Sequence, residues 1–376
     1  MKNFRYTKGL HDLGNGLHAW LLPDGSWGWS NAGLIADSGQ TLLVDTLFDL
    51  NLTREMLDAM RDAVPAANDI GALVNTHGNG DHTFGNQLLE GKRIIAAAGC
   101  LDDMRHRPPE QLAQWQREWR SMGIAGKFWY EVMGAHFDFQ GIRMVLPNET
   151  FAGEKRMMVG DKEVVLVEVG PAHTRGDVLV YVPRDKTVFT GDILFNGGHP
   201  AIWAGPVSNW IAACDRMLGW DLETVVPGHG PITDKAGIRE MRDYLAYLLV
   251  ESKKCMDAGM GFEQAAEKIA LDRWLNWGES ERIYVNVHAC YRELAADPSS
   301  SEEKGIRMAL LEMMGKRYFA NKDAGKGGHG GHGDHCGPGC GHDHAHGHEH
   351  AHGHDHAHDH DHGHDHGHDH KHDHKH

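Results

Sequence analysis

The chain has 376 residues, of which 40% are hydrophobic, so it is long enough for one large domain with a substantial core and further segments. Its formal net charge is −16 with histidine counted as neutral, which disfavours binding to nucleic acid or to an anionic membrane and argues against a nuclease. The sequence has no run of about 18 apolar residues and no apolar segment near its start, so neither a membrane span nor a secretory signal is expected.

The first hundred residues predict strands, a helix and one unusual loop. Residues 20–46 contain β-rich runs separated by turn signals, and apolar residues at helical spacing predict a helix from Leu50 to Met60. A short buried strand at 72–74 leads into Asn-Thr-His-Gly-Asn-Gly-Asp-His at 75–82, and a further strand is expected at 93–96. Two imidazoles and a carboxylate therefore stand on a Gly-rich turn at the end of a strand, where α/β folds place chemistry.

Residues 102–140 differ in character and are expected to form an insertion. Pro108 and Pro109 favour a helix start, and aromatic residues recur at helical spacing after them. We expect this insertion to form a lid over a site or a subunit contact. The alternative is that its aromatic residues belong to the core.

A second strand-rich half follows, with strands expected at 163–169, 177–182, 187–190 and 223–226. Ser208 is expected to cap a helix that runs through Leu218, and a long helix is expected from Ile238 toward Cys255. Residues 256–320 predict a helical extension of two or three amphipathic helices that packs on the core or forms a homodimer. No residue of the extension carries an identifiable chemistry.

The last segment, residues 321–376, is Gly-rich and then alternates histidine with aspartate, glycine or alanine. It holds 21 of the 31 histidines and lacks the apolar residues that a core needs, so a disordered tail is expected. Candidate ligands for Ni, Co or Zn in the tail include Cys336, Cys340, His342, His344 and His346. The tail is predicted to store metal or to deliver it to a neighbouring site; the alternative is a solubilising end.

The other four cysteines, Cys100, Cys214, Cys255 and Cys290, are scattered through helix-like or apolar surroundings. This distribution is typical of reduced core residues, so a cytoplasmic location is expected.

Polar side chains follow several apolar runs in the same way as the loop at 75–82. They are Asp45, then His173 in Gly-Pro-Ala-His-Thr, Asp192 in Phe-Thr-Gly-Asp, and His229 in Pro-Gly-His-Gly. Imidazole and carboxylate are ligands for Zn²⁺ and its neighbours, so these strand ends predict a metal site. The alternative is that they are ordinary polar residues on loops.

This order of residues resembles the metallo-β-lactamase superfamily, whose core motif H-x-H-x-D-H is followed by a distant His, an Asp and a last His. The resemblance spans about residues 20–250 and implies an α/β fold of the αββα sandwich type, with a catalytic domain at 1–255. One residue departs from the motif, because Asn79 stands where the second His is expected.

The resemblance also implies two metal positions. His77, position 79 and His173 would hold the first metal, Asp81, His82 and His229 the second, and Asp192 would bridge them. Asn79 offers only a neutral amide oxygen, so one tight Zn²⁺ at the second position and a weaker or absent metal at the first are expected. Asp45 is expected to position the loop or a ligand rather than to bind metal.

The implied chemistry is hydrolysis by a metal-activated water. Asp81 is expected to orient that water, while His77 and His173 are candidates for proton transfer. Asn196, His199 and Trp203, which follow the bridging aspartate, are candidate substrate contacts; alternatively they only shape their loop.

We therefore expect a zinc-dependent hydrolase that acts on a small-molecule ester, lactone, thioester, amide or carbon–halogen bond. Within the superfamily the motifs resemble the branch that includes the hydrolytic chlorothalonil dehalogenase. The alternative is a metal storage or delivery protein whose degenerate site has lost catalysis.

Overall fold

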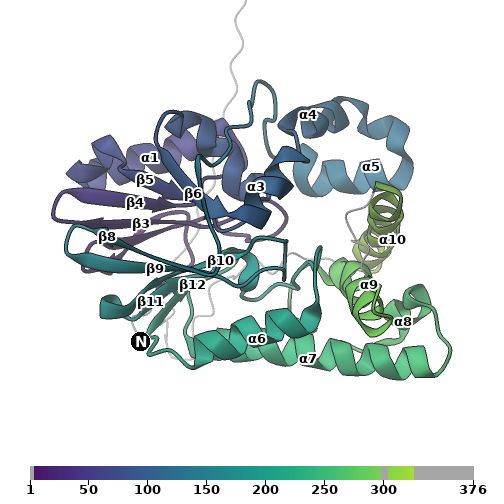
Figure 1. Cartoon of the computed structure of the whole chain (residues 1–376). Coiled ribbons are helices and arrows are strands. Elements are labelled where there is room, and N and C mark those ends of the chain that lie inside the picture. The colour runs from purple at the N-terminus through teal and green to yellow at the C-terminus, as the bar shows by residue number, and fades with distance from the viewer. Residues whose placement is uncertain (1–3, 298–303, 326–376) are drawn as a thin grey trace, which may run out of the picture. The chain divides into compact units, whose positions relative to one another are not determined.

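Two β-sheets lie face to face in this computed structural model, which describes residues 4–297 and 304–325 (Figure 1). In these ranges the first sheet has seven strands in chain order: β1 (Gly9–Gly14), β2 (Leu17–Leu21), β3 (Ala32–Asp37), β4 (Gln40–Val44), β5 (Ala72–Val74), β6 (Arg93–Ala97) and β7 (Glu149–Phe151). The second sheet has the order β12 (Thr224–Val226), β11 (Thr187–Phe189), β10 (Val178–Val182), β9 (Lys162–Glu168) and β8 (Glu154–Val159).

The central strands, such as β4 and β9, are apolar on both faces because both faces of their sheets are covered there. Neighbouring residues of a strand point to opposite faces of its sheet. Val44 and Val164 lie in the cluster between the two sheets. Their neighbours Leu43 and Val165 lie in the clusters on the outer faces, where helices cover them.

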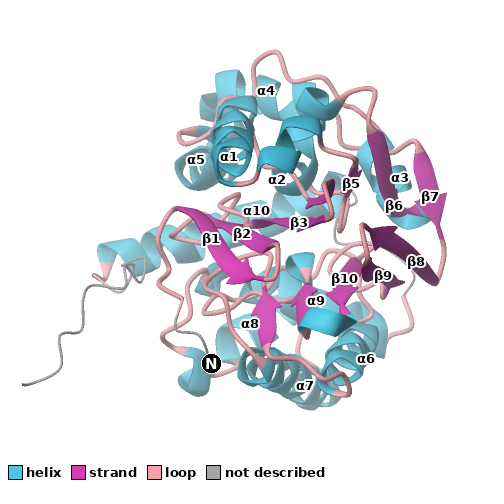
Figure 2. Cartoon of the chain, turned by 90° about the vertical axis from the view of Figure 1, so that its left-hand side faces the viewer, coloured by secondary structure: helices cyan, strands magenta, loops and turns pink. Residues whose placement is uncertain are grey.

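The outer layers are helical, which completes the predicted αββα sandwich. Helix α1 (Leu50–Ala63) covers the first sheet and buries Met56 and Met60 against it. Helices α6 (Val207–Leu218) and α7 (Lys235–Asp257) cover the second sheet with side chains such as Trp210 and Met241. Figure 2 shows α1 on one side of the sheets and α6 and α7 on the other. The expected α/β sandwich is confirmed.

The start of α6 differs from the sequence-based expectation. Ser208 was expected to cap this helix, but α6 begins at Val207, one residue earlier. Glu293, from helix α9 (Ile283–Leu294), accepts hydrogen bonds from the backbone N–H groups of Val207 at 2.6 Å and of Ser208 at 3.2 Å. A carboxylate from a distant helix thus satisfies the N–H groups that a local cap was expected to satisfy.

The insertion is helical and packs against the C-terminal extension of the same chain. It begins within α3 (Ala98–Arg105) and contains α4 (Pro109–Glu118), α5 (Gly123–Trp129) and a π-helical turn (Tyr130–Gly134). A Cβ added at Gly315, in α10 (Lys304–Asp323), would lie 2.9 Å from Phe128 Cβ and 3.1 Å from the carbonyl oxygen of Ile124. Glycine therefore lets α10 approach α5 closely, and Figure 1 shows the two helices side by side.

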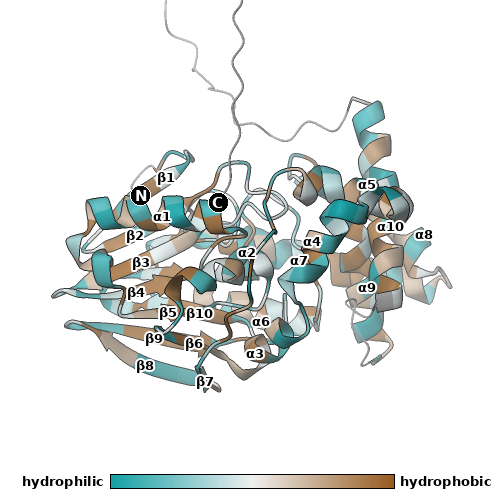
Figure 3. Ribbon diagram, turned by 90° about the horizontal axis from the view of Figure 1, so that it is seen from above, coloured by the Kyte–Doolittle hydropathy of each residue, from teal (hydrophilic) through white to brown (hydrophobic). Residues whose placement is uncertain are grey.

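Shorter elements complete the described part. They are α2 (Gly80–Thr83), α8 (Phe262–Lys268) and the 3-10 helices η1 (Pro65–Asp69), η2 (Phe84–Leu89), η3 (Trp119–Met122), η5 (Pro183–Asp185), η6 (Gly191–Ile193), η7 (Asp272–Trp274) and η8 (Ser280–Arg282). In Figure 3, β3 and β4 are mainly apolar, whereas α1 carries both polar and apolar residues, as expected for a helix with one buried face.

Several expectations concern residues at the margin of the described ranges or beyond them. Helix α10 continues to Asp323, past the expected end of the extension at 320, and the histidine-rich tail lies outside the described residues. Cys100, Cys214, Cys255 and Cys290 are buried and unbonded to one another, as predicted. Among the described residues, none of the helices combines the length and apolar character that crossing a membrane requires.

Candidate metal centre

Loops at the carboxyl ends of strands from both sheets supply the predicted ligands. Strand β5 runs parallel to β4, and β12 runs parallel to β11, so the ends of each pair meet at one edge. Asp45 follows β4, the loop at 75–82 follows β5, Asp192 follows β11, and His229 follows β12. The loop between β9 and β10 adds His173. Because both sheets bring these edges together, residues far apart in sequence share one site.

The ligand atoms fall into two compact groups among the described residues. His77, His82 and Asp192 form one group, and Asp81, His82 and His229 form the other, with all ligand atoms of a group within 4.8 Å of one another. His173 belongs to neither group. The set predicted for the second metal position therefore converges, whereas the set predicted for the first does not converge fully.

The Asp192 carboxylate lies at the centre of the cluster. Its oxygens are 3.0 Å from His82 Nε2, 3.3 Å from His173 Nε2, 3.4 Å from His229 Nε2 and 3.7 Å from His77 Nε2. This is the central placement that a bridging carboxylate requires.

Glycines on both sides make room for this carboxylate. Gly191 has φ +49°, which favours glycine, and a Cβ there would lie 2.3 Å from Thr76 Oγ1. A Cβ at Gly228 would lie 2.1 Å from the Oδ1 atom of Asp192. A larger residue in place of either glycine, in Phe-Thr-Gly-Asp or Pro-Gly-His-Gly, would therefore clash with a neighbouring side chain.

Unsatisfied buried atoms indicate that the cluster is built for a cation. His77 Nε2 is buried and makes no hydrogen bond with the described residues, whereas His82 Nε2 and Asp192 Oδ1 are buried 3.0 Å from each other. A buried polar atom without a partner is rare in proteins, and all three atoms belong to one cluster of imidazole and carboxylate groups. These donor types suit a divalent transition metal, so the residues of the second position fit such an ion.

Partners outside the cluster fix the orientation of its imidazole rings. His229 Nδ1 lies 3.1 Å from the carbonyl oxygens of Gly25 and Trp29, so it donates its proton there. His82 Nδ1 lies 3.0 Å from Asp45 Oδ2. In both residues the outward nitrogen is engaged, and the Nε2 atom points into the cluster, which is the orientation that metal-binding histidines adopt.

Asp45 anchors the loop instead of entering the cluster. Its carboxylate accepts hydrogen bonds from the backbone N–H of Thr76 at 2.7 Å and from Thr76 Oγ1 at 2.6 Å, besides the contact with His82. Burial raises the pKa of Asp45, although hydrogen bonding and charge from His82 oppose this shift. Asp45 also has φ +61°, a conformation that few residues other than glycine adopt.

The charges of the cluster balance internally. Burial alone disfavours the charged form of each residue, but the Asp192 carboxylate raises the pKa of His82 well above its ordinary value and that of His229 to about 9. The same interactions outweigh burial at Asp192, where His229 and His82 hold the pKa well below its usual range. Protons on these imidazoles therefore balance the carboxylates, and a bound cation would displace them.

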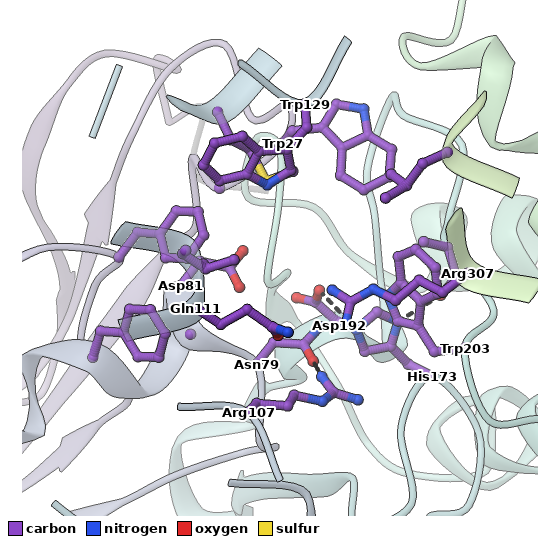
Figure 4. A pocket seen from close by; sticks show the side chains of 18 of the residues that line it. Trp27, Asn79, Asp81, Arg107, Gln111, Trp129, His173, Asp192, Trp203 and Arg307 are labelled. Atoms are coloured by element: carbon purple, nitrogen blue, oxygen red, sulfur yellow. Dashed lines mark hydrogen bonds and ion pairs between the residues drawn. The ribbon is translucent and has the colours of Figure 1, made fainter. Parts of the chain in front are cut away.

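Asn79 does not offer its oxygen to the cluster. The Asn79 Oδ1 atom accepts a hydrogen bond from Arg107 Nη1, and Asn79 Nδ2 lies 2.8 Å from His173 Nε2 (Figure 4). The amide oxygen, which was the expected weak ligand, thus faces a guanidinium group, whereas the amide nitrogen faces an imidazole.

A pocket with a volume of about 110 Å³ opens above the cluster. Asp81, Asp192, His173 and His229 line its polar side, and Asp81 and Asp192 face the cavity in Figure 4. The other walls are largely aromatic and include Trp27, Phe48, Phe84, Trp115, Trp129 and Trp203. The pocket therefore joins a charged floor to apolar walls.

The insertion and the helical extension contribute much of the pocket. Arg107, Gln111, Trp115 and Met133 come from residues 102–140, as a lid would require. Arg282, Arg307 and Leu311 come from the extension, for which the sequence indicated no chemistry. These arginines were missed because their signal is spatial: each lies far in sequence from every metal-ligand motif.

The three candidate substrate residues differ in position. Trp203 lines the pocket, but Asn196 and His199 are not among its lining residues. Asn196 Nδ2 donates to the carbonyl oxygen of Pro231 at 2.8 Å, so its amide holds the loop. His199 is buried between Tyr244 and Trp277, and burial lowers its pKa to about 3. The side chains of Asn196 and His199 therefore shape their loop, which was the alternative stated above.

Comparison with known proteins agrees with this arrangement. Residues 25–229 match the family model of the metallo-beta-lactamase superfamily. The acyl-coenzyme A thioesterase MBLAC2 of Gallus gallus is 24% identical over 226 residues, which cover 53% of this chain and 72% of that protein. The 2,4-dinitroanisole O-demethylase subunit alpha of Nocardioides sp. (strain JS1661) is 30% identical over 86 residues, 21% of this chain and 25% of that protein.

A solved structure shares the fold at low sequence identity. The inverting sec-alkylsulfatase Pisa1 from Pseudomonas sp. superposes with a TM-score of 0.57 and 17% identity, covering 85% of this chain and 57% of that one. The chain thus spans a quarter of the demethylase subunit and little more than half of the sulfatase.

Proposed function

Because the chain belongs to the metallo-beta-lactamase superfamily, we propose that it is a metal-dependent hydrolase of a small-molecule substrate. The observation that carries the proposal is the convergence of buried imidazole and carboxylate ligand atoms, within 4.8 Å of one another in each group, beside a pocket lined by Asp81, Asp192 and His229. We propose Zn²⁺ as the metal, held at the second position by Asp81, His82, Asp192 and His229. A divalent cation there supplies Lewis acidity, which activates water and polarises the substrate.

The residues of the chain have distinct roles in this proposal. Asp192 and Asp81 bring negative charge to the floor of the pocket, and Asp81 Oδ2, 3.4 Å from His229 Nε2, is placed to orient water. Burial and the charge of His82 hold the pKa of His77 well below its ordinary value, so His77 stays neutral and can accept a hydrogen bond from the attacking water. Trp27, Trp129 and Trp203 exclude bulk water from the floor of the pocket.

The walls of the pocket support a substrate class. Aromatic side chains favour an apolar or aromatic body, and the guanidinium groups of Arg107, Arg282 and Arg307 favour an electron-rich or anionic group on it. An ester, lactone, thioester, amide or carbon–halogen bond within such a molecule fits this proposal. The activity named for the thioesterase relative supports inclusion of thioesters, and the resemblance to the chlorothalonil dehalogenase branch supports inclusion of aryl halides.

A second candidate function rests on a different observation. Residues 326–376 lie outside the described part, but their composition, with 21 histidines from His329 onward, favours binding of Ni²⁺, Co²⁺ or Zn²⁺. Metal storage or delivery is therefore the rival function. The four buried, unbonded cysteines support a reducing compartment such as the cytoplasm for either function.

One experiment separates the two functions. The full chain and a chain that ends at Gly325 are loaded with Zn²⁺ and assayed with aryl esters, lactones, thioesters, amides and halogenated nitriles. We expect both forms to turn over at least one class, and the Asp192→Ala variant to lose both that turnover and the tightly bound metal. Absence of turnover with every class, together with intact metal uptake by the full chain, would favour storage or delivery.

A further inference from the structure

The Asn79 side chain is held between a cation and an imidazole at the first metal position. Arg107 Nη1 donates a hydrogen bond to Asn79 Oδ1, which fixes the amide so that its oxygen faces away from His173. The Nδ2 atom of the same amide lies 2.8 Å from His173 Nε2. Arg107 thereby decides which end of the Asn79 amide faces the cluster.

The hydrogen bonding of His173 shows that its Nε2 atom accepts. His173 Nδ1 lies 2.7 Å from the carbonyl oxygen of Ala201, which can only accept, so Nδ1 carries the proton. The Nε2 atom faces the amide nitrogen of Asn79, which can only donate, so Nε2 is the acceptor of the ring. The lone pair that would bind a metal therefore accepts an N–H of Asn79.

The first position consequently lacks a complete set of donors. Asn79 presents N–H groups, His173 Nε2 is occupied, and His173 lies outside both groups of ligand atoms that come within 4.8 Å of one another. Of the residues predicted for this position, His77 and Asp192 belong to a group of converging ligand atoms, whereas His173 Nε2 lies 3.3 Å from Asp192 but is also taken by the Asn79 amide. These donors do not fit a second divalent cation, in contrast to the intact second position.

The charge of Arg107 adds to this effect. Arg107 lines the pocket and is hydrogen-bonded to Asn79, so its guanidinium group brings a positive charge near the first position. A fixed positive charge near this position disfavours a divalent cation there. Like charges separated by a few ångströms in a partly buried site repel strongly enough to change a dissociation constant by on the order of tenfold or more.

We propose that Arg107 is a positioning residue that keeps the first metal position closed, by turning the Asn79 amide N–H toward His173 and by placing a fixed positive charge beside that position. The inference rests on the proposed function only in that the second position holds a metal. The protein supplies the second cation of the pocket from its own chain, and the metal cluster contains a single ion.

The test counts metal ions and needs no substrate. Every residue of the hydrophobic clusters in the described part precedes Gly325, so a chain that ends there keeps the whole described core. Zinc content is measured by mass spectrometry after dialysis against a weak chelator, and the affinity for a second zinc is measured by titration. The full chain is measured in parallel, since its tail contributes equally to each variant and cancels in differences.

The variants separate the effect of Arg107 from a general loss of structure. Arg105→Met is the matched control, because Arg105 is exposed, is paired with Asp102 and lies outside the pocket lining. Arg107→Lys keeps a positive donor for Asn79, so its zinc content should match that of the parent. Arg107→Met should bind a second zinc at least about tenfold more tightly than the Arg105 control. Asn79→His should bind two ions per chain.

Specific results would overturn the proposal. They are two equally tight zinc ions in the parent chain, an Arg107→Met affinity for the second ion equal to that of the control, or a folded Asn79→His variant with a single ion. If Arg107→Met does not fold, as judged by its thermal melting curve, Arg107→Gln, which keeps a hydrogen-bond donor but removes the charge, is measured in its place and should bind the second zinc more tightly than the Arg105 control. Failure of every substrate assay would remove the proposed hydrolase function but would leave these counts unchanged.

Discussion

The Asp45 carboxylate accepts a hydrogen bond from Nδ1 of His82 at 3.0 Å, and both side chains are fully buried. The same carboxylate holds the backbone N–H and the hydroxyl group of Thr76, so one residue at the end of β4 fixes the loop that follows β5. His82 Nε2 is thereby aimed at Asp192, 3.0 Å away. The geometry of the cluster thus depends on a residue that does not enter it.

Asp45→Asn should weaken metal binding without removing a ligand. The amide presents one acceptor where the carboxylate presents two and lacks its charge, so Thr76 and His82 lose part of their support. We expect a 10- to 100-fold loss of zinc affinity, on the order typical for residues that support a ligand. Competition with a chelator measures this loss, and Asp58→Asn, an exposed helical site, is the control. An unchanged affinity would contradict the role of Asp45.

Gly228→Ala should disturb the cluster by steric contact. The added methyl group would lie 2.1 Å from Asp192 Oδ1, so the bridging carboxylate must move. We expect the tightly bound metal to be lost or weakened by at least about tenfold while the fold is kept. Gly305→Ala, where nothing lies within 4 Å of the added atom, is the matched control and should retain its metal.

His199 should make the fold sensitive to acid. Its pKa falls from 6.5 to about 3 because it is buried, so below pH 6.5 the unfolded chain takes up a proton that the folded chain does not. The contribution of the neutral His199 to the free energy of unfolding is therefore fully present above pH 6.5 and is lost as the pH falls toward 3. The loss at pH 5 is about 2 kcal/mol.

Urea unfolding of the parent and of His199→Gln at pH 7.5 and pH 5 tests this prediction. The variant is expected to be less stable at pH 7.5 but to lose less stability between the two pH values. His136→Gln, at an exposed histidine, should follow the parent. Equal losses in His199→Gln and the parent would rule out a neutral, buried imidazole at this position.

The histidine-rich tail should carry a metal pool that acid releases. The ordinary histidine pKa is about 6.5, so most tail imidazoles can bind metal at pH 7.5 and are protonated near pH 5. We expect the full chain to take up many Ni²⁺, Co²⁺ or Zn²⁺ ions at pH 7.5 and to release most of them by pH 5. Equilibrium dialysis should show no such pool in the chain that ends at Gly325.

If the tail delivers metal, the activities of the full and shortened chains should differ when metal is scarce. In metal-poor medium the full chain should be more active than the chain that ends at Gly325, and an excess of zinc should abolish the difference. Activity per mole of protein, measured after growth at graded zinc levels, tests this expectation. Equal activity at every level would leave the tail as a store or a passive end.

Sequence patterns predicted the layers of the fold and the positions of the metal ligands for a physical reason. Period-two and helical spacing determine which face of an element is buried, and the polar residue after each apolar run lies at a strand end wherever the strands are placed. Asp192 and His229 were predicted in this way, and their side chains lie 3.4 Å apart. The chain segments that carry them are distant in sequence, since 36 positions separate Thr190, just before Asp192, from Val226, just before His229.

Contacts across the chain were not predictable from the same patterns. Three such contacts join segments whose local sequences carry no sign of one another. Glu293 caps α6, Arg107 donates a hydrogen bond to Asn79, and Arg307 lines the pocket. His199 shows the opposite error: a polar residue near a ligand motif suggested a substrate contact, but burial between aromatic rings gives it a structural role.

The metal ligands and the walls of the pocket come from different elements, and this has a practical consequence for engineering new activities. The metal ligands stand on loops between strands, whereas Leu112, Trp115 and Leu311 stand on helices of the insertion and the extension. These three wall positions can be randomised together while the charge and hydrogen bonding of the ligand loops stay as they are. A library of this kind samples new substrate shapes over an unchanged reactive floor, so screening for altered specificity starts from variants that still hold their metal.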